Sequence, residues 1–153
     1  MSILRSCREF VEILKSCYDG KLVSVVLFGS AARGQVGQRS DIDLLVVMEG
    51  WPKSRLDRHE LWLNAAQEVS EEFAQWASVI PLTPAEAAVI KPYYLGMLSG
   101  HRILFDRGAF FHRIMQRLRR RLRALGSERR IDHEGREYWI LKKDVKPGET
   151  VIL

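Results

Sequence analysis

The chain has 153 residues, enough for one domain with a sizeable core and hardly enough for two. Its 46% hydrophobic and 28% charged residues are ordinary for a globular protein. The apolar runs fall far short of the roughly 20 residues that cross a bilayer, and the N-terminus lacks the apolar segment of a secretory signal. We therefore expect a cytoplasmic protein with no membrane association.

The net charge of +5 is unevenly distributed along the chain. Residues 1–100 contain 10 basic and 12 acidic residues, whereas residues 101–153 contain 14 basic and 7 acidic ones. This asymmetry favours a polyanion or an acidic partner for the C-terminal third. A solvated basic helix surface is the alternative.

The first part of the chain alternates between helical and strand patterns. Apolar residues at 3–4 spacing predict a helix over residues 2–19, which Gly20 ends. Two valine-rich apolar runs predict strands covered on both faces, Val23–Phe28 and Ile42–Met48. In the polar connection between them, Ser30 suits the cap of a short helix.

The middle of the chain contains two helix-start signals. Ser54 opens a helix whose apolar stripe runs from Leu56 as far as Trp76. A third strand is expected over Ser78–Leu82, and Thr83-Pro84-Ala85-Glu86 then combines a Thr cap, a Pro at the first helical position and a Glu at the third.

The last part predicts a short helix, a short strand, a long arginine-rich helix and a hairpin, at residues 93–98, 103–105, 109–125 and 129–141. The fold class is therefore α/β, with a small mixed sheet flanked by helices and a short C-terminal helix and hairpin extension. Residues 1–106 are expected to form the core, and residues 107–153 to form the basic extension packed on the same domain.

The segment from Leu22 to Met48 carries the chemistry. Gly29 and Ser30 follow a buried strand, where backbone amides can cradle phosphate groups. Asp41 and Asp43 are two residues apart, so on a strand both carboxylates project from one face. Carboxylates and phosphate oxygens are the ligands that Mg²⁺ prefers, and the segment therefore predicts a metal–nucleotide site.

The chain contains Gly29-Ser30, ten further residues and then Asp41-x-Asp43. This pattern resembles the signature of the nucleotidyltransferase superfamily related to DNA polymerase β. More closely, GSAARG followed by SDIDLLVV is similar to the minimal nucleotidyltransferases of bacteria and archaea. Members of that family are often encoded beside a HEPN-domain partner. The resemblance implies a nucleotidyltransferase-like fold and Mg²⁺-dependent transfer of a nucleoside monophosphate, AMP from ATP, to an acceptor hydroxyl.

By the same resemblance, Gly29 and Ser30 bind the triphosphate, and Asp41 and Asp43 are the catalytic and metal-binding residues. Arg33 is expected to contact phosphate or to pair with an exposed acid. Ser40 is placed with the nucleotide-binding residues, although it also suits the entry to the second strand.

One superfamily feature is missing, because active members carry a third carboxylate on a later strand, and the corresponding strand here contains no acid. Glu86 follows that strand, but the helix-start signal accounts for it. Two interpretations therefore stay open. One is an antitoxin that modifies a HEPN toxin, and the other is a module that binds a nucleoside triphosphate or neutralises a partner with little catalysis. A third possibility is an RNA-directed enzyme that binds nucleic acid through the arginines of residues 117–123, with Tyr138 and Trp139 as a stacking surface.

Overall fold

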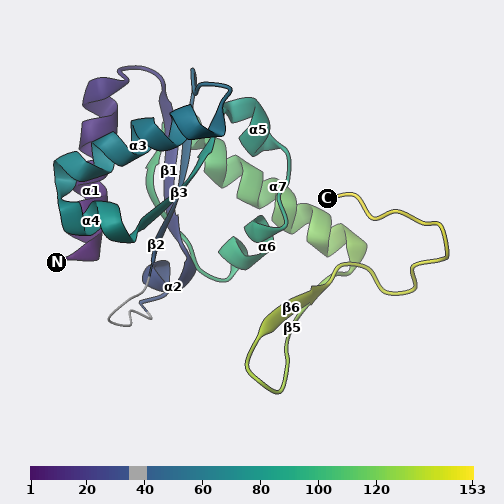
Figure 1. The fold of residues 1–153 in the computed structure, drawn as a ribbon. Helices are drawn as coiled ribbons and strands as arrows, with labels where there is room; N and C mark the ends of the chain where they lie inside the picture. The colour runs from purple at the N-terminus through teal and green to yellow at the C-terminus, as the bar shows by residue number, and fades with distance from the viewer. Residues whose placement is uncertain (35–40) are drawn as a thin grey trace.

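The computed structural model describes residues 1–34 and 41–153. It contains a four-stranded sheet, a separate two-stranded hairpin and helices on both faces of the larger sheet (Figure 1). In chain order the elements are α1 (Ile3–Cys17), β1 (Leu22–Phe28), α2 (Gly29–Ala32), β2 (Ile42–Met48), α3 (Arg55–Val69), α4 (Glu71–Trp76), β3 (Ala77–Leu82), α5 (Pro84–Ala88), α6 (Tyr93–Leu98), β4 (Arg102–Asp106), the 3-10 helix η1 (Arg107–Ala109), α7 (Phe110–Leu125), β5 (Glu128–Ile131) and β6 (Glu137–Ile140).

The sheet is mixed, with strand order β3-β2-β1-β4. β1 pairs antiparallel with both β2 and β4, whereas β2 and β3 run parallel. β1 and β2, which flank the segment that begins with Gly29 and Ser30, are thus the central strands of the sheet. Their central position explains their continuous apolar sequences. The mixed α/β architecture predicted from the sequence is confirmed.

Alternation along β2 divides the interior into two cores. Ile42, Leu44, Val46 and Met48 point into a core shared with α1, α3 and α4, while Leu45 and Val47 point into a core shared with α5, α6 and α7. The two sets of helices lie on opposite sides of the sheet in Figure 1. Asp43 belongs to the same side as Leu45 and Val47, since alternate residues of a strand share a face.

Local signals account for most helix boundaries. Ser2, Ser54 and Thr83 accept hydrogen bonds from backbone N–H groups three residues on, and Thr83 with Glu86 forms the predicted reciprocal capping box. The predicted helix running to Trp76 is divided, however. The backbone of Ser70 is extended and its hydroxyl accepts from Phe73 N–H at 3.0 Å, so it ends α3 and caps α4.

Two further expectations are wrong in detail. Ser30 does not cap a helix, because α2 already begins at Gly29, preceded by Phe28 without a side-chain cap. The apolar stripe of α3 does not begin at Leu56, which is 72% exposed because it lies on the first turn, away from the sheet.

The C-terminal elements separate into a packed helix and a projecting part. α7 places five buried side chains in the second core: Phe111, Ile114, Met115, Leu118 and Leu122. Gly126 ends the helix in the left-handed conformation. The β5–β6 hairpin projects from the far end of α7, away from the four-stranded sheet, and the following C-terminal segment loops back so that the chain ends beside α7 (Figure 1). In the described residues, no helix has the length and apolarity needed to span a bilayer.

Candidate active site

The candidate site lies where β1 turns into α2 beside the start of β2. Phe28 is in register with Asp43, so the Gly29 backbone lies against the Asp43 side chain. A Cβ placed on Gly29 would stand 2.4 Å from Asp43 Oδ2, and Gly29 has a φ of +71°. Only glycine satisfies both conditions, since any side chain would displace the carboxylate and would also strain the backbone.

Three strands contribute neighbouring positions to this site. Asp43 of β2 is flanked by Phe28 of β1 and by Ser78 of β3. Ser78 shares the face of Asp43, because Ile80 and Leu82 of the same strand point into the second core. Ser78 is exposed and therefore occupies the position beside Asp43 at which an acidic side chain from β3 would reach the site.

Electrostatics couple the two aspartates. Partial burial raises the pKa of Asp43, and the nearby carboxylate of Asp41 raises that pKa further. Asp41 is exposed just before β2 begins, whereas Asp43 is half-buried. Two carboxylates that repel each other at the end of a strand are stabilised by a bound cation, and their hard oxygens suit Mg²⁺.

The residue types present therefore fit a divalent metal ion. The donor set consists of Asp41 and Asp43, and within residues 1–34 and 41–153 no group of three or more His, Cys, Asp and Glu side chains suited to a metal gathers. Mg²⁺ usually keeps several waters and takes one or two carboxylates together with substrate phosphate oxygens. Two aspartates beside a glycine turn match that requirement.

The other predicted nucleotide-binding residues divide into two groups. Ser30 lies in the single turn of α2, directly after Gly29. Arg33 is exposed, and its side chain lies over the α6–β4 connection, where a Cβ on Gly100 would stand 2.7 Å from Arg33 Cγ. Arg33 makes no ion pair among the described residues. Ser40 lies outside the described residues.

An aromatic wall that the sequence did not predict borders the site. Tyr93 of α6 stacks on Phe28, with ring centroids 6.5 Å apart and planes 16° apart. Because Phe28 is the register partner of Asp43, this pair stands beside the carboxylates. No sequence pattern identifies such a contact, since 65 positions separate the two rings along the chain.

Glu86 has a structural role. Its carboxylate accepts a hydrogen bond from Thr83 N–H at 2.8 Å and pairs with Arg58 at 2.8 Å. Both contacts lower the pKa of Glu86, and the hydrogen bond from Thr83 N–H has the larger effect. Arg58 also donates to Pro81 O at 3.1 Å, so the pair ties α3 to the end of β3. These contacts account for Glu86 at the helix start, as the sequence predicted.

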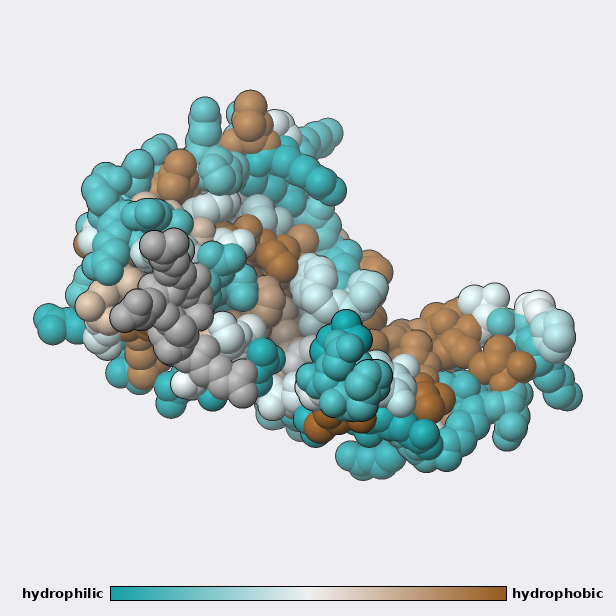
Figure 2. Space-filling model, turned by 60° about the horizontal axis from the view of Figure 1, so that its bottom comes forward, coloured by the Kyte–Doolittle hydropathy of each residue, from teal (hydrophilic) through white to brown (hydrophobic). Residues whose placement is uncertain are grey.

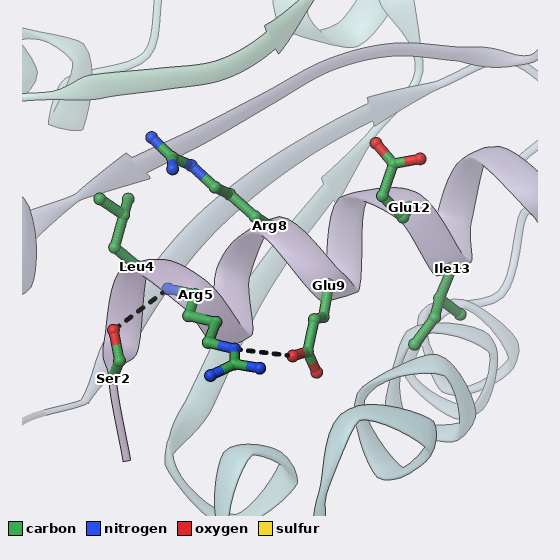
Figure 3. Close-up of a pocket in the computed structure, with 7 residues that line it drawn as sticks. All are labelled: Ser2, Leu4, Arg5, Arg8, Glu9, Glu12 and Ile13. Carbon is green, nitrogen blue, oxygen red and sulfur yellow. Dashed lines mark hydrogen bonds and ion pairs between the residues drawn. The ribbon is translucent and has the colours of Figure 1, made fainter.

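A hollow of about 740 Å³ lies over the outer face of α1 (Figure 3). Its wall is a single helix, on which Ser2 caps the first turn and Arg5 pairs with Glu9 at 3.6 Å. α1 covers the sheet face opposite to that of Asp43. This hollow is thus separate from the candidate site.

Comparison with known proteins identifies the class. The family described as "Nucleotidyltransferase domain" matches residues 7–91, more than half of the chain. "Putative protein adenylyltransferase MJ1305" of Methanocaldococcus jannaschii is 34% identical over 113 residues, which cover 72% of this chain and 77% of that protein. "Putative protein adenylyltransferase MJ0604" of the same organism is 49% identical over 43 residues, covering 28% and 43% respectively.

Solved structures agree on the fold. A toxin–antitoxin structure with AMP-PNP is 18% identical with a TM-score of 0.50, and the match covers 78% of this chain and 90% of that one. A mutant of the toxin–antitoxin MntA-HpeT is 16% identical with a TM-score of 0.50, and the match covers 81% and 91%. At these identities the likeness concerns the fold alone.

The chain belongs to the nucleotidyltransferase domain family. The resemblance seen in Gly29-Ser30 and Asp41-x-Asp43 is thereby confirmed, and the protein is a nucleotidyltransferase by family membership and by its sequence relatives.

Proposed function

We propose that this protein transfers AMP from ATP to a hydroxyl group of a protein acceptor in a Mg²⁺-dependent reaction. The observation that carries the proposal is the contact between Gly29 and Asp43, because it joins a backbone turn open to phosphate with a carboxylate poised for a metal. The relatives named as protein adenylyltransferases support AMP as the transferred group and a protein as the acceptor.

In this proposal Gly29 and Ser30 present the backbone and a hydroxyl to the triphosphate, and Arg33 provides a positive charge beside it. Asp41 and Asp43 hold Mg²⁺, and Ser40 completes the nucleotide contacts. A bound Mg²⁺ would neutralise the charge on the phosphate oxygens and orient them for in-line attack. The acceptor oxygen forms a bond to the α-phosphorus, the bond to the bridging oxygen breaks, pyrophosphate leaves and the hydroxyl proton passes to water.

A HEPN-domain protein is the acceptor that we propose, so that modification neutralises a toxin. Minimal nucleotidyltransferases, which this sequence resembles, are often encoded beside such a partner. The structural neighbours from toxin–antitoxin complexes are consistent with that pairing.

The test is transfer of radiolabel from [α-³²P]ATP to a HEPN-domain protein encoded beside this chain. We expect label on the partner with Mg²⁺, and none with the variant Asp41→Ala plus Asp43→Ala. Label that persists in a folded double variant would refute the assigned site.

A second candidate is a nucleotide-sensing or partner-neutralising module with little catalysis. Ser78 favours it, because the exposed position beside Asp43 carries a hydroxyl where a third carboxylate would complete the site. The two candidates separate in one assay. Binding of Mg²⁺–ATP with no pyrophosphate released, in the presence of the partner, would support the module and exclude the enzyme.

A further inference from the structure

A second feature of the molecule lies outside the candidate active site, where α7, the end of α6 and the hairpin meet. Two adjoining hollows of about 310 and 330 Å³ share Arg119 and Arg123 in their walls. We call them together the α7–hairpin groove. Its lining residues are Leu98, Ser99, Gln116, Arg119, Arg120, Leu122, Arg123, Ser127, Arg129 and Trp139.

The groove is strongly positive. Four arginines line it, and its lining contains no carboxylate. Arg129 pairs with Glu137 at 3.1 Å, but Arg119, Arg120 and Arg123 make neither an ion pair nor a hydrogen bond in the part of the chain that the structure describes. Three exposed guanidinium groups close together on one helix repel one another, so an anionic ligand would stabilise them.

The other arginines of α7 differ in their contacts. Arg117 donates to Ala88 O at 3.0 Å, and Arg121 donates to Ile152 O at 2.8 Å. With Arg113 they recur every four residues, so they form a separate line along the helix. Arg117 and Arg121 thus donate hydrogen bonds to α5 and to the C-terminal segment. Arg119, Arg120 and Arg123 instead line the groove.

The groove also offers a flat aromatic wall and hydroxyl groups. Trp139 lines it together with Ser99 and Ser127, and the indole Nε1 of Trp139 is buried without an acceptor in the described residues. Buried donors are normally satisfied, so this unpaired N–H disfavours the ligand-free arrangement. Ser99 directly precedes Gly100, against which Arg33 packs.

We infer that the α7–hairpin groove binds single-stranded nucleic acid. The arginines would contact successive phosphates, and Trp139 would stack with a base, the combination typical of single-strand binding surfaces. An acidic protein segment would use the positive charge but would gain nothing specific from the aromatic wall. Figure 2 brings forward the projecting part of the molecule, where hydrophilic and hydrophobic side chains lie side by side. This inference does not depend on adenylyl transfer.

The experiment measures binding of the full-length protein to a fluorescein-labelled 12-nucleotide oligouridylate by fluorescence anisotropy, between 50 and 200 mM salt. Four phosphate contacts predict a slope of about −3 in log K against log salt, equivalent to roughly fiftyfold weaker binding over this range. Arg119→Gln, Arg120→Gln and Arg123→Gln combined should weaken binding at least about tenfold and flatten the slope to about −0.7.

The matched control combines Arg113→Gln, Arg117→Gln and Arg121→Gln, which remove the same charge from the same helix. We expect this variant to lose less than about threefold in affinity, since its arginines lie outside the groove. Trp139→Leu should cost at least about fivefold through lost stacking. Circular dichroism verifies that each variant is folded, and label transfer from ATP should be unchanged in the groove variant.

Equal losses in the two triple variants would overturn the proposal, because binding would then depend on net charge alone. Failure of the wild-type protein to bind the oligonucleotide at 50 mM salt would also overturn it. A third contradicting result would be that an oligoglutamate peptide binds more tightly than the oligonucleotide and binds the groove variant more weakly than wild type. That result would identify the groove as a site for an acidic protein.

Discussion

At the scale of single residues, Gly29 and Asp43 depend on each other. The positive φ of Gly29 turns the chain out of β1, and the absence of a side chain leaves room for Asp43 Oδ2. The carboxylate is half-buried beside Asp41, an arrangement that is costly unless a cation is bound. Local geometry thus favours function over stability in the absence of a ligand.

Gly29→Ala should disable the site. The new Cβ would displace the Asp43 carboxylate, and a misplacement of about 1 Å at a reacting centre can cost about 100-fold in rate. The left-handed backbone adds a further cost of about 1–2 kcal/mol in stability. Label transfer and thermal melting measure the two effects.

Gly20→Ala is the matched control, because Gly20 has a φ of +73° but nothing within 4 Å of its would-be Cβ. It should show the loss of stability without the loss of activity. Equal activity losses in the two variants would contradict the proposed contact with Asp43.

Asp43→Asn should stabilise the ligand-free protein at neutral pH. The pKa of Asp43 is raised in the folded state, so the folded protein holds this proton more tightly than the unfolded chain. The resulting stability is present at acid pH and is lost as the pH rises through the raised pKa. Asn carries no charge and avoids that loss.

Thermal melting between pH 4 and pH 8 measures this effect. The advantage of Asp43→Asn over wild type should grow as the pH rises from 4, and Mg²⁺–ATP should raise the melting temperature of wild type alone. A variant that is less stable than wild type at pH 7 would contradict the electrostatic argument.

At the scale of elements, one aspartate links β1, β4 and α7. Asp106 accepts from the buried Ser24 hydroxyl at 2.6 Å and from the N–H groups of Phe111 and His112 at 2.9 and 3.0 Å. It therefore satisfies the first turn of α7 although it does not occupy the N-cap position. α7 in turn covers the sheet face that carries Asp43.

Asp106→Ala should destabilise the whole domain by about 2 kcal/mol, because it leaves a buried hydroxyl and two helix N–H groups unpaired. Asp132 offers a control with a similar number of hydrogen bonds, since it accepts from Glu134 and Arg136 in the exposed hairpin turn. Asp132→Ala should cost less than about 1 kcal/mol. Urea denaturation measures both, and equal costs would show that Asp106 has no special role.

Local patterns explain why many elements were predictable. Ser54, Thr83 and Gly126 act within a few residues of their position, and so their effects could be read from the chain. Asp41 and Asp43 were identifiable because spacing places them together on any strand. The contacts that complete the site are different, because the pairing of Asp43 with Ser78 and the stacking of Tyr93 on Phe28 depend on tertiary structure.

At the scale of the whole molecule, the basic C-terminal third has two parts with different packing. α7 contributes five buried side chains to the second core, whereas the hairpin and the last segment add only partly buried ones. The division into a core of residues 1–106 and an extension packed on the same domain, residues 107–153, stays a prediction.

Truncation tests how far the core depends on that extension. A chain that ends at Gly126 should still melt cooperatively and transfer label, with a melting temperature lower by several degrees. A chain that ends at residue 106 should not fold, because each buried side chain of α7 is worth about 1.5–3 kcal/mol, and together they approach the stability of a typical domain. A cooperative transition in the shorter chain would show that residues 1–106 fold independently.

The central claim is that Gly29, Asp41 and Asp43 form a metal–nucleotide site. Isothermal titration calorimetry with a non-hydrolysable ATP analogue tests it most directly, because the result does not depend on finding the acceptor. Wild type should bind the analogue in the presence of Mg²⁺ and at least about tenfold more weakly in EDTA, whereas folded Asp41→Asn plus Asp43→Asn should lose this dependence on Mg²⁺. An unchanged Mg²⁺ dependence in the double variant would contradict the account.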